Sequence, residues 1–528
     1  MKTLIIGKED IPRQWIYWFL FLSMILLLLV ACATPRIHRI TVEPSEFKIA
    51  KASDDYPYIK LHVQNGQAYS LNSWKFNESE KLITGVGELL DINRNILESD
   101  TFAVPFANIV LVETNRIDAS SPLVALSFMT GLTVAGAAYC VINPKACFGS
   151  CPTFYVYDGN DFVIQAEGFS SSVAPSLEAR DIDAISKVKP HSSDLLIKVT
   201  NEAFETHVIR YANILALLHR IGTKVFSTPD GEFWEADNIQ QPRICEGPEG
   251  DCTIELLTLD GIERFSTADS FNLANTEILE FTFDNAPKGR KGLIVSFRQS
   301  LLTTFLFYQS LAYMGADVGY WLSQMERLNN NLQEKIKYVG SLLGGIQIQI
   351  QSDDGEWKSV GEIKETGPIA TDIKLVPLPE NLSDNPLKVR LKMVKGLWRI
   401  DHVALSEIIN KIEPLRIEPT KVFYSGNEDK KILNQLLDTN KTLVTLPGDE
   451  YLIYYKLPDN YADYELFIES QGYYLEWMRN EWLVDENPLR IKQILFNPNQ
   501  YLKDLAPKFK EIEAEMEKSF WNSRYVIP

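Results

Sequence analysis

The chain has 528 residues, and 52 Lys and Arg against 70 Asp and Glu give it a formal net charge of −18 at pH 7. This charge excludes a basic nucleic-acid-binding protein, because such proteins need a positive surface. Hydrophobic residues make up 45% of the chain and aromatic residues 11%, so it can bury sizeable cores. The six cysteines are too few for a disulfide-dense scaffold. At this length we expect about three folded domains.

The first 31 residues have the pattern of a secretory signal peptide. Three basic residues precede an uncharged, mostly apolar run over 15–30, which is short for a membrane span of about 20 residues. The run ends in Leu29-Val30-Ala31-Cys32, which resembles the lipobox of bacterial lipoproteins. The resemblance implies cleavage before Cys32 and acylation (palmitate and related chains) of that cysteine. The alternative is an ordinary leader or an N-terminal anchor helix.

The residues after Cys32 favour a protein that faces the periplasm. The segment 33–36 contains no acidic run, and the mature chain remains strongly acidic. Because an acidic chain repels anionic lipid, attachment to the membrane would depend on the acyl chains.

Two pairs of cysteines lie close in the sequence. Three residues separate Cys147 from Cys151, and a turn-rich loop separates Cys245 from Cys252. An oxidising compartment favours a local disulfide in each pair. Zinc is the alternative, although neither spacing is the tight knuckle that zinc sites use. Cys140 is then the odd thiol, either buried or paired with Cys147 in place of Cys151.

The mature chain begins with a predicted small β-barrel over 32–117. Its residues alternate between apolar and polar, as in Ile59–Val63, and Asn65-Gly66 marks a turn. The apolar segment 118–146 follows, uncharged over 119–144. Its length alone would allow a membrane span. A single crossing would, however, place all later cysteines in a reducing cytosol, so we favour a buried or re-entrant helical hairpin.

Residues 147–297 are predicted to form a β-rich domain. The strand-like run 154–157 precedes Asp158-Gly159-Asn160-Asp161, and Asp-Gly recurs at 230–231, 260–261 and 354–355. Such dipeptides connect hairpin strands because glycine accepts a positive φ. A calcium loop is the alternative for 158–161, but the chelating glutamate and alternating spacing of an EF-hand are missing.

Residues 298–415 are predicted to combine a helix with a jelly-roll-like sandwich. Apolar residues recur at intervals of three and four over 299–337, which indicates one long packing helix. Alternation then takes over at 346–351 and 388–393, where apolar residues alternate with glutamine, lysine or arginine, and a further strand is predicted at 398–405. These strands look like half of a jelly roll of the galactose-binding-like kind.

Residues 416–528 are predicted to form a β module closed by a charged C-terminal helix over 501–519. The module contains an aromatic cluster made of Tyr473, Tyr474, Trp477 and Trp482. Exposed rings of this kind can form a platform on which sugar rings stack, whereas buried rings form a core. Strand alternation places Tyr473 and Tyr474 on opposite faces, so only some rings can be exposed. We favour the core.

Four segments, 147–174, 201–206, 298–315 and 472–479, resemble segments of a group of uncharacterised bacterial envelope proteins. They include the runs C-F-G-S-C-P-T-F-Y-V-Y-D-G and G-Y-Y-L-E-W-M-R. The resemblance implies a shared architecture over most of the mature chain. It carries over no catalytic residues.

The sequence contains none of the common catalytic, metal or cofactor motifs, so we assign no catalytic residue, no metal and no cofactor. Glu202, Glu205 and His207 are the most suggestive polar group. Alternation places Glu205 and His207 on one face of a strand, with Glu202 on the other. We expect them to be solvent-facing strand residues rather than a site.

The sequence therefore predicts a mainly β protein: several small β-barrel or β-sandwich modules, one long packing helix and a C-terminal helix. It also predicts a lipid-anchored cell-envelope protein with a non-enzymatic binding or scaffolding role. Its partners would be the membrane, through the N-terminal lipid, and envelope proteins or glycan. The alternatives are a carbohydrate- or peptidoglycan-binding lipoprotein and an envelope hydrolase, which as a glycosidase would need two facing carboxylates.

Overall fold

The structure is a computed structural model. It describes residues 36–42, 51–52, 59–63, 67–90, 96–118, 151–173, 175–203, 205–318, 321, 335, 338, 340–352, 354–364, 367–380, 382, 386–477, 483 and 485–524. The predicted signal peptide, the lipidation site Cys32, the apolar segment 118–146 beyond its first residue, and the side chains of Cys140, Cys147 and Trp482 lie outside these residues. The chain divides into an N-terminal unit (1–138 with 479–483) and a C-terminal unit (139–478 with 484–528), which we describe separately.

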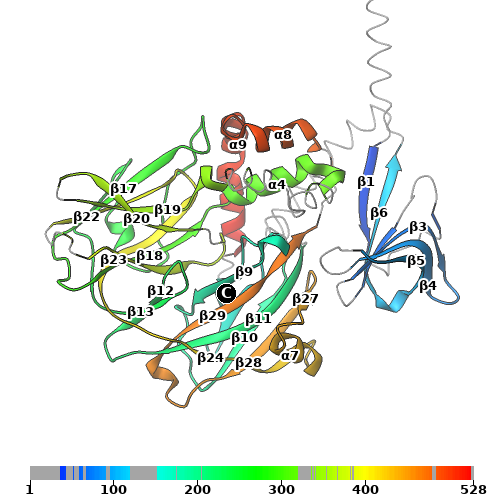
Figure 1. Cartoon of the computed structure of the whole chain (residues 1–528), viewed down its shortest axis with the longest axis horizontal. Helices are drawn as coiled ribbons and strands as arrows, with labels where there is room; N and C mark the ends of the chain where they lie inside the picture. The colour runs from blue at the N-terminus through cyan, green and yellow to red at the C-terminus, as the bar shows by residue number, and fades with distance from the viewer. Residues whose placement is uncertain are drawn as a thin grey trace, which may run out of the picture. The chain divides into compact units, whose positions relative to one another are not determined.

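The N-terminal unit contains one antiparallel sheet with the strand order β1-β6-β2-β3-β4-β5 (Figure 1). Its strands are β1 (Arg36–Val42), β2 (Ile59–Val63), β3 (Ala68–Asn77), β4 (Leu82–Leu90), β5 (Ile96–Pro105) and β6 (Ile109–Asp118), with the short helix η2 (Phe106–Asn108) before β6. One face buries the core residues Leu61, Trp74 and Ile83. At Gly87 in β4 a Cβ would lie 1.9 Å from the carbonyl oxygen of Ser70, so only glycine allows the two strands to approach. The small β-barrel predicted over 32–117 thus corresponds, in the described residues, to one six-stranded sheet with β1 and β5 at its two edges.

The C-terminal unit consists of two β-sandwiches, and the second is inserted into the first. The first sandwich is formed by the strands over 153–218 and 415–476. The second sandwich is formed by the strands over 224–411. β11 (Glu205–Leu218) pairs with β29 (Tyr464–Glu476) along almost its whole length, from Glu205↔Glu476 to Leu218↔Tyr464. The sheets therefore group the chain differently from the predicted segments 147–297, 298–415 and 416–528, because strand pairs cross both predicted boundaries.

The first sandwich has two sheets. One has the order β26-β25-β28-β10-β7-β8, and the other has the order β24-β11-β29-β9 with β27 added to β11. The remaining bounds are β7 (Thr153–Tyr157), β8 (Phe162–Glu167), β9 (Ala179–Ala184), β10 (Asp194–Thr200), β24 (Leu415–Ile417), β25 (Pro419–Tyr424), β26 (Asn427–Glu428), β27 (Leu443–Thr445), β28 (Glu450–Lys456), η3 (Pro175–Leu177) and η6 (Tyr461–Asp463). Between the sheets lie Phe154, Ile214 and Ile453, and the Tyr455 hydroxyl donates to the Ala212 carbonyl at 2.9 Å. Helix α7 (Lys430–Leu437) buries Ile432 against this core.

The second sandwich contains a sheet that closes into a small five-strand barrel. The path β13-β12-β21-β18-β23 returns to its start because β13 also pairs with β23, and β16 adds to β23. The bounds are β12 (Lys224–Ser227), β13 (Phe233–Gln240), β16 (Arg264–Phe265), β18 (Lys291–Gln299), β21 (Asp372–Pro377) and β23 (Trp398–Lys411). Every residue of β18 is buried, because Ile294 faces the barrel interior while Leu293 and Val295 face the core of the sandwich. This explains the apolar run Leu293-Ile294-Val295 at its centre.

The other sheet of the second sandwich has the order β15-β14-β17-β22-β19-β20 (Figure 1). Its strands are β14 (Ile244–Gly247), β15 (Gly250–Asp251), β17 (Thr276–Phe283), β19 (Ile346–Gln351), β20 (Trp357–Ile363) and β22 (Leu387–Val394), and η4 (Ile254–Leu256) follows β15. Ile348, Leu391 and Phe281 point into the core, as the alternation predicts. The strand predictions over 346–405 are confirmed here.

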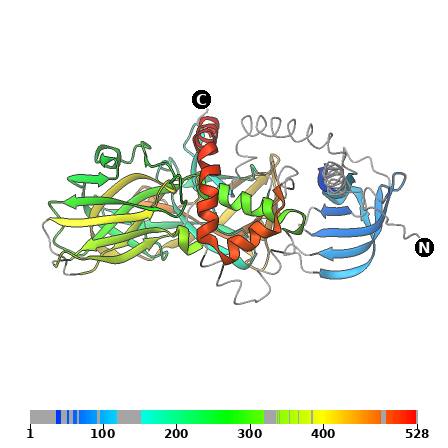
Figure 2. The same ribbon diagram turned by 90° about the horizontal axis from the view of Figure 1, so that it is seen from above.

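Three helices close one side of the second sandwich (Figures 1 and 2). They are α4 (Leu302–Met314), α8 (Pro488–Phe496) and α9 (Pro498–Arg524), and η5 (Gly315–Asp317) follows α4. Phe305 of α4 stacks against Phe509 of α9 with ring centroids 4.9 Å apart, and both rings belong to the sandwich core. Of the helix predicted over 299–337, α4 accounts for the first part and ends where Gly315 takes a φ of 55°. Residues 322–334 lie outside the described part.

The mainly β fold with several modules and a C-terminal helix is confirmed. The turn 158–161 is a hairpin between β7 and β8, and Asp158 Oδ1 accepts from the backbone N–H groups of Asn160 and Asp161, each at 2.8 Å. These bonds occupy the carboxylate in an Asx turn, which supports the hairpin over a calcium loop. The dipeptides at 230–231 and 354–355 also lie in hairpins, whereas 260–261 lies in the loop between η4 and β16.

Candidate functional site

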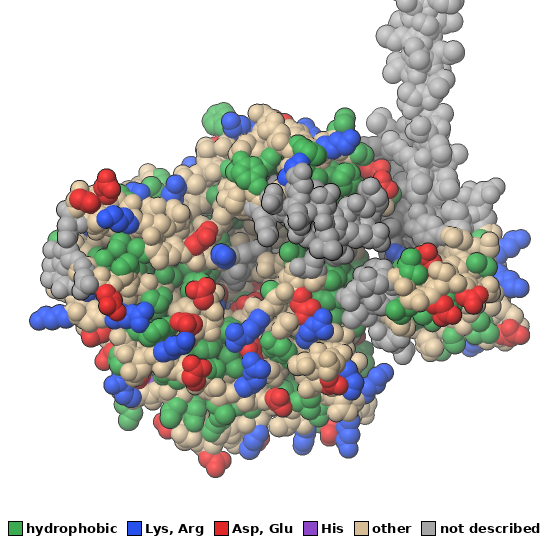
Figure 3. All heavy atoms as spheres, in the orientation of Figure 1, with side chains coloured by type: hydrophobic (Ala, Val, Ile, Leu, Met, Phe, Trp, Pro, Cys, Tyr) green, Lys and Arg blue, Asp and Glu red, His purple; other side chains and the backbone are tan. Residues whose placement is uncertain are grey.

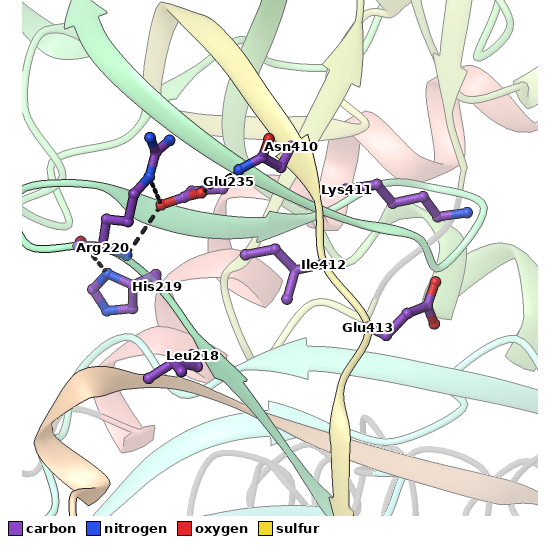
Figure 4. A pocket seen from close by; sticks show the side chains of 8 residues that line it. All are labelled: Leu218, His219, Arg220, Glu235, Asn410, Lys411, Ile412 and Glu413. Atoms are coloured by element: carbon purple, nitrogen blue, oxygen red, sulfur yellow. Dashed lines mark hydrogen bonds and ion pairs between the residues drawn. The ribbon is translucent and has the colours of Figure 1, made fainter.

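A cleft of about 600 Å³ lies where the chain passes between the two sandwiches. The chain leaves the first sandwich at the end of β11, at Leu218, and returns to it after β23, at Lys411. Both passages line the cleft together with β13 (Figure 4). Its lining residues are Leu218, His219, Arg220, Glu235, Asn410, Lys411, Ile412 and Glu413.

Glu235 of β13 is the anchor of this cleft, and only 2% of its surface is exposed. One carboxylate oxygen accepts from the backbone N–H of Arg220 at 3.0 Å, from Arg220 Nε at 2.9 Å and from the Thr223 hydroxyl at 2.7 Å. The other oxygen accepts from Asn410 Nδ2 at 3.0 Å. Burial tends to raise the pKa of Glu235, but these hydrogen bonds outweigh it and lower the pKa to about 2. The carboxylate is therefore ionised and fully engaged near neutral pH.

This geometry makes the cleft a joint between passages rather than an acid–base site. The donors to Glu235 come from the outgoing passage (Arg220 and Thr223) and from the end of β23 (Asn410), so one carboxylate ties the outgoing passage and the end of β23 to β13. A general acid or base would need a pKa near the working pH. Lys411 is engaged by Glu232 at 2.8 Å at the rim.

A contact between the two sandwiches is buried. Lys374 of β21 donates to Asp372 Oδ2 at 2.8 Å, to the carbonyl of Ile182 in β9 at 2.7 Å and to the Ser227 hydroxyl at 3.3 Å. Asp183 of β9 is 4% exposed, and its Oδ2 has no hydrogen-bond partner in the described part of the chain. The ammonium of one sandwich therefore meets the strand edge and acids of the other.

Burial and mutual repulsion govern the protonation of this contact, which we call the Lys374 cluster (Asp181, Asp183, Asp372 and Lys374). Burial, followed by repulsion from Asp181 and Asp372, raises the pKa of Asp183 well above its ordinary value. Burial is also the main reason why the pKa of Asp181 is raised. Burial lowers the pKa of Lys374, but the three carboxylates outweigh it and raise the pKa. The cluster thus favours a charged lysine among acids that hold protons more tightly than usual.

Glu205 and His207 do lie on one face of β11, with Glu205 Oε1 3.5 Å from His207 Nε2. They are, however, 1% and 0% exposed, so the expectation that they face solvent was wrong. Cys151 lies in the same interior, where burial and then the charges of Glu167 and Glu205 raise the pKa of its thiol. A protonated, enclosed thiol is not an activated nucleophile.

The predicted aromatic platform is mostly interior. Tyr473 is 1% exposed and Tyr474 is 7% exposed, and the Tyr474 hydroxyl donates to the Ser170 carbonyl at 3.0 Å. Trp477 is half-buried and its Nε1 donates to the Thr206 hydroxyl at 2.9 Å. The two tyrosines are core side chains, the interpretation that the sequence favoured, and they offer no open face to a sugar ring.

Cys245 and Cys252 face each other across the β14–β15 hairpin. Both are buried, their sulfur atoms are 3.0 Å apart, and the Cys252 N–H donates to the Cys245 carbonyl at 3.0 Å. Both are thiols in this structure, and the described residues contain no disulfide. Cys151 is described as a thiol without its predicted partner Cys147, which lies outside the described ranges.

No group of three or more His, Cys, Asp or Glu side chains within the described residues is arranged to hold a metal ion. None of the helices in that part of the chain is both long enough and apolar enough to cross a membrane.

Neither Glu235 nor the Lys374 cluster was predicted from the sequence as a functional group of residues. A signal was present for the cluster: Asp181-Ile182-Asp183 and Asp372-Ile373-Lys374 each place two charges on one face of a strand. Their pairing across 190 residues of sequence could not be inferred from that pattern. Glu235 lies between an aromatic pair and an alanine, and nothing in this run indicates its four donors.

No family model matches the chain, and no curated protein matches it. Among solved structures, a β-porphyranase of glycoside hydrolase family 86 from the human gut bacterium Bacteroides plebeius is 10% identical, with a TM-score of 0.16. The match covers 48% of this chain and 40% of that one, so less than half of the hydrolase is spanned. The VP2 subviral particle of infectious bursal disease virus is 9% identical over 93% of this chain and 92% of that chain, with a TM-score of 0.11. TM-scores this low do not establish a shared fold.

Proposed function

We propose that the chain is a lipid-anchored protein of the bacterial cell envelope with a non-enzymatic binding or scaffolding role. The lipobox-like run Leu29-Val30-Ala31-Cys32 supports both the lipid anchor and the location in the cell envelope. The observation that carries the role is the buried contact between the sandwiches, in which Lys374 of β21 donates to the Ile182 carbonyl of β9 at 2.7 Å.

A scaffold must hold its surfaces in a fixed relation, and two contacts serve this end. Glu235 holds the outgoing passage and the end of β23 on β13, and Lys374 ties β21 to β9 in the interior. Because the Glu235 side chain is 3% exposed and the Lys374 side chain is 12% exposed, their charged hydrogen bonds resist separation more strongly than a fully exposed ion pair would. On the face shown in Figure 3, acidic and basic side chains are mixed across the C-terminal unit, as on a soluble binding module.

The anchor is tested by Cys32→Ala in the full chain, expressed in a bacterium and labelled with an alkyne analogue of palmitate. Wild-type protein should take up the label and lose its leader, because acylation and cleavage both depend on the cysteine. The variant should accumulate as an unlabelled precursor, as wild type should under globomycin. Normal processing of Cys32→Ala would contradict the proposal.

The redox state of Cys245 and Cys252 tests export from the cytoplasm independently of the lipid anchor. Their sulfur atoms, 3.0 Å apart, need to move closer by about 1 Å to form a bond, which an oxidising compartment favours. We expect protein alkylated at harvest to carry this pair as a disulfide, measured by mass spectrometry. Two alkylated thiols at 245 and 252 would indicate a reducing location.

A further inference from the structure

We draw no further inference here: the strongest candidate, the outer face of the sheet β26-β25-β28-β10-β7-β8 in the first sandwich, where Tyr155, Phe162 and Tyr454 point away from the core, carries none because nothing in the described part of the chain shows what covers this aromatic face.

Discussion

Two buried sites of the C-terminal unit, one where the chain enters the second sandwich and one between the sandwiches, have opposite electrostatics. At the cleft, one carboxylate, Glu235, meets four donors, and its pKa falls to about 2. In the Lys374 cluster, one ammonium meets three carboxylates, and the pKa of Asp183 rises. Both carboxyl groups are less than 5% exposed, so burial alone does not decide the direction. The number of donors per carboxylate decides whether burial is overcome.

The two contacts therefore respond to pH in opposite ways. The pKa of Glu235 is lower in the folded state than in the unfolded state, so its stabilisation is present above its ordinary pKa of 4.5 and is lost as pH falls towards about 2. The pKa of Asp183 is higher in the folded state, so its contribution is present below 3.8 and is lost as pH rises through its folded pKa.

The largest expected effect comes from removing the ammonium of the cluster. Lys374→Met leaves the carboxylates of Asp181, Asp183 and Asp372 without their cation and should destabilise the C-terminal unit by about 3 to 5 kcal/mol at pH 8. The loss should be smaller at pH 5, because the acids with raised pKa then take up protons. Urea unfolding of the full chain at both pH values measures the difference.

Lys441→Met is the matched control, because Lys441 is 55% exposed and pairs with its near neighbour Asp438 at 3.1 Å. Such a surface pair should contribute less than about 1 kcal/mol. Equal losses for the two variants, or a Lys374→Met loss that does not change between pH 5 and pH 8, would show that the cluster does not hold the sandwiches together.

An intermediate effect is expected at the cleft. Glu235→Gln removes the charge and places an N–H₂ group against donors from Arg220 or Asn410, so we expect a loss of about 2 to 3 kcal/mol at pH 7. The loss should stay constant between pH 8 and pH 5, where the loss for Lys374→Met changes, and should shrink only as pH falls below 4.5. Thermal unfolding midpoints from pH 3 to pH 8 test the sign. A pH-independent loss would mean that the charge of Glu235 is unimportant.

Local pattern predicts the strands and helices of this chain well, but not their partners. Ile346, Ile348 and Ile350 alternate with glutamines and form β19, because alternation directly reports which face of a strand is buried. The pairing of β11 with β29 joins residues more than 240 apart in the sequence. No local signal specifies such a partner, so the insertion of one sandwich into the other could not be derived.

The same limit applies to the sites. Alternation correctly places Glu205 and His207 on one face of β11, yet it cannot say whether that face meets solvent or another layer. Tyr473 and Tyr474 show this most clearly: they point to opposite faces of β29, and both are buried because both faces of the strand are covered. A strand that is buried on both faces can show the same alternating sequence as a strand with one face in solvent, provided that its buried polar side chains find hydrogen-bond partners in the protein interior.

The smallest expected effect sharpens the comparison with a third carboxyl group, Asp401 of β23. It is 3% exposed and accepts from the backbone N–H of Gly261 at 3.1 Å, so it has far fewer donors than Glu235. Burial, together with the charge of Glu263, raises its pKa from 3.8 to about 6, and its contribution to stability is therefore present below 3.8 and lost as pH rises through about 6.

Asp401→Asn mimics the protonated acid. We expect it to match wild type at pH 4 and to exceed it at pH 7.5 by about 1 to 2 kcal/mol, a rise in Tm of roughly 2 to 5 °C. A variant that is less stable than wild type at pH 7.5 would show that the ionised form of Asp401 is the one that the fold prefers, and that donor number does not govern the direction of the shift.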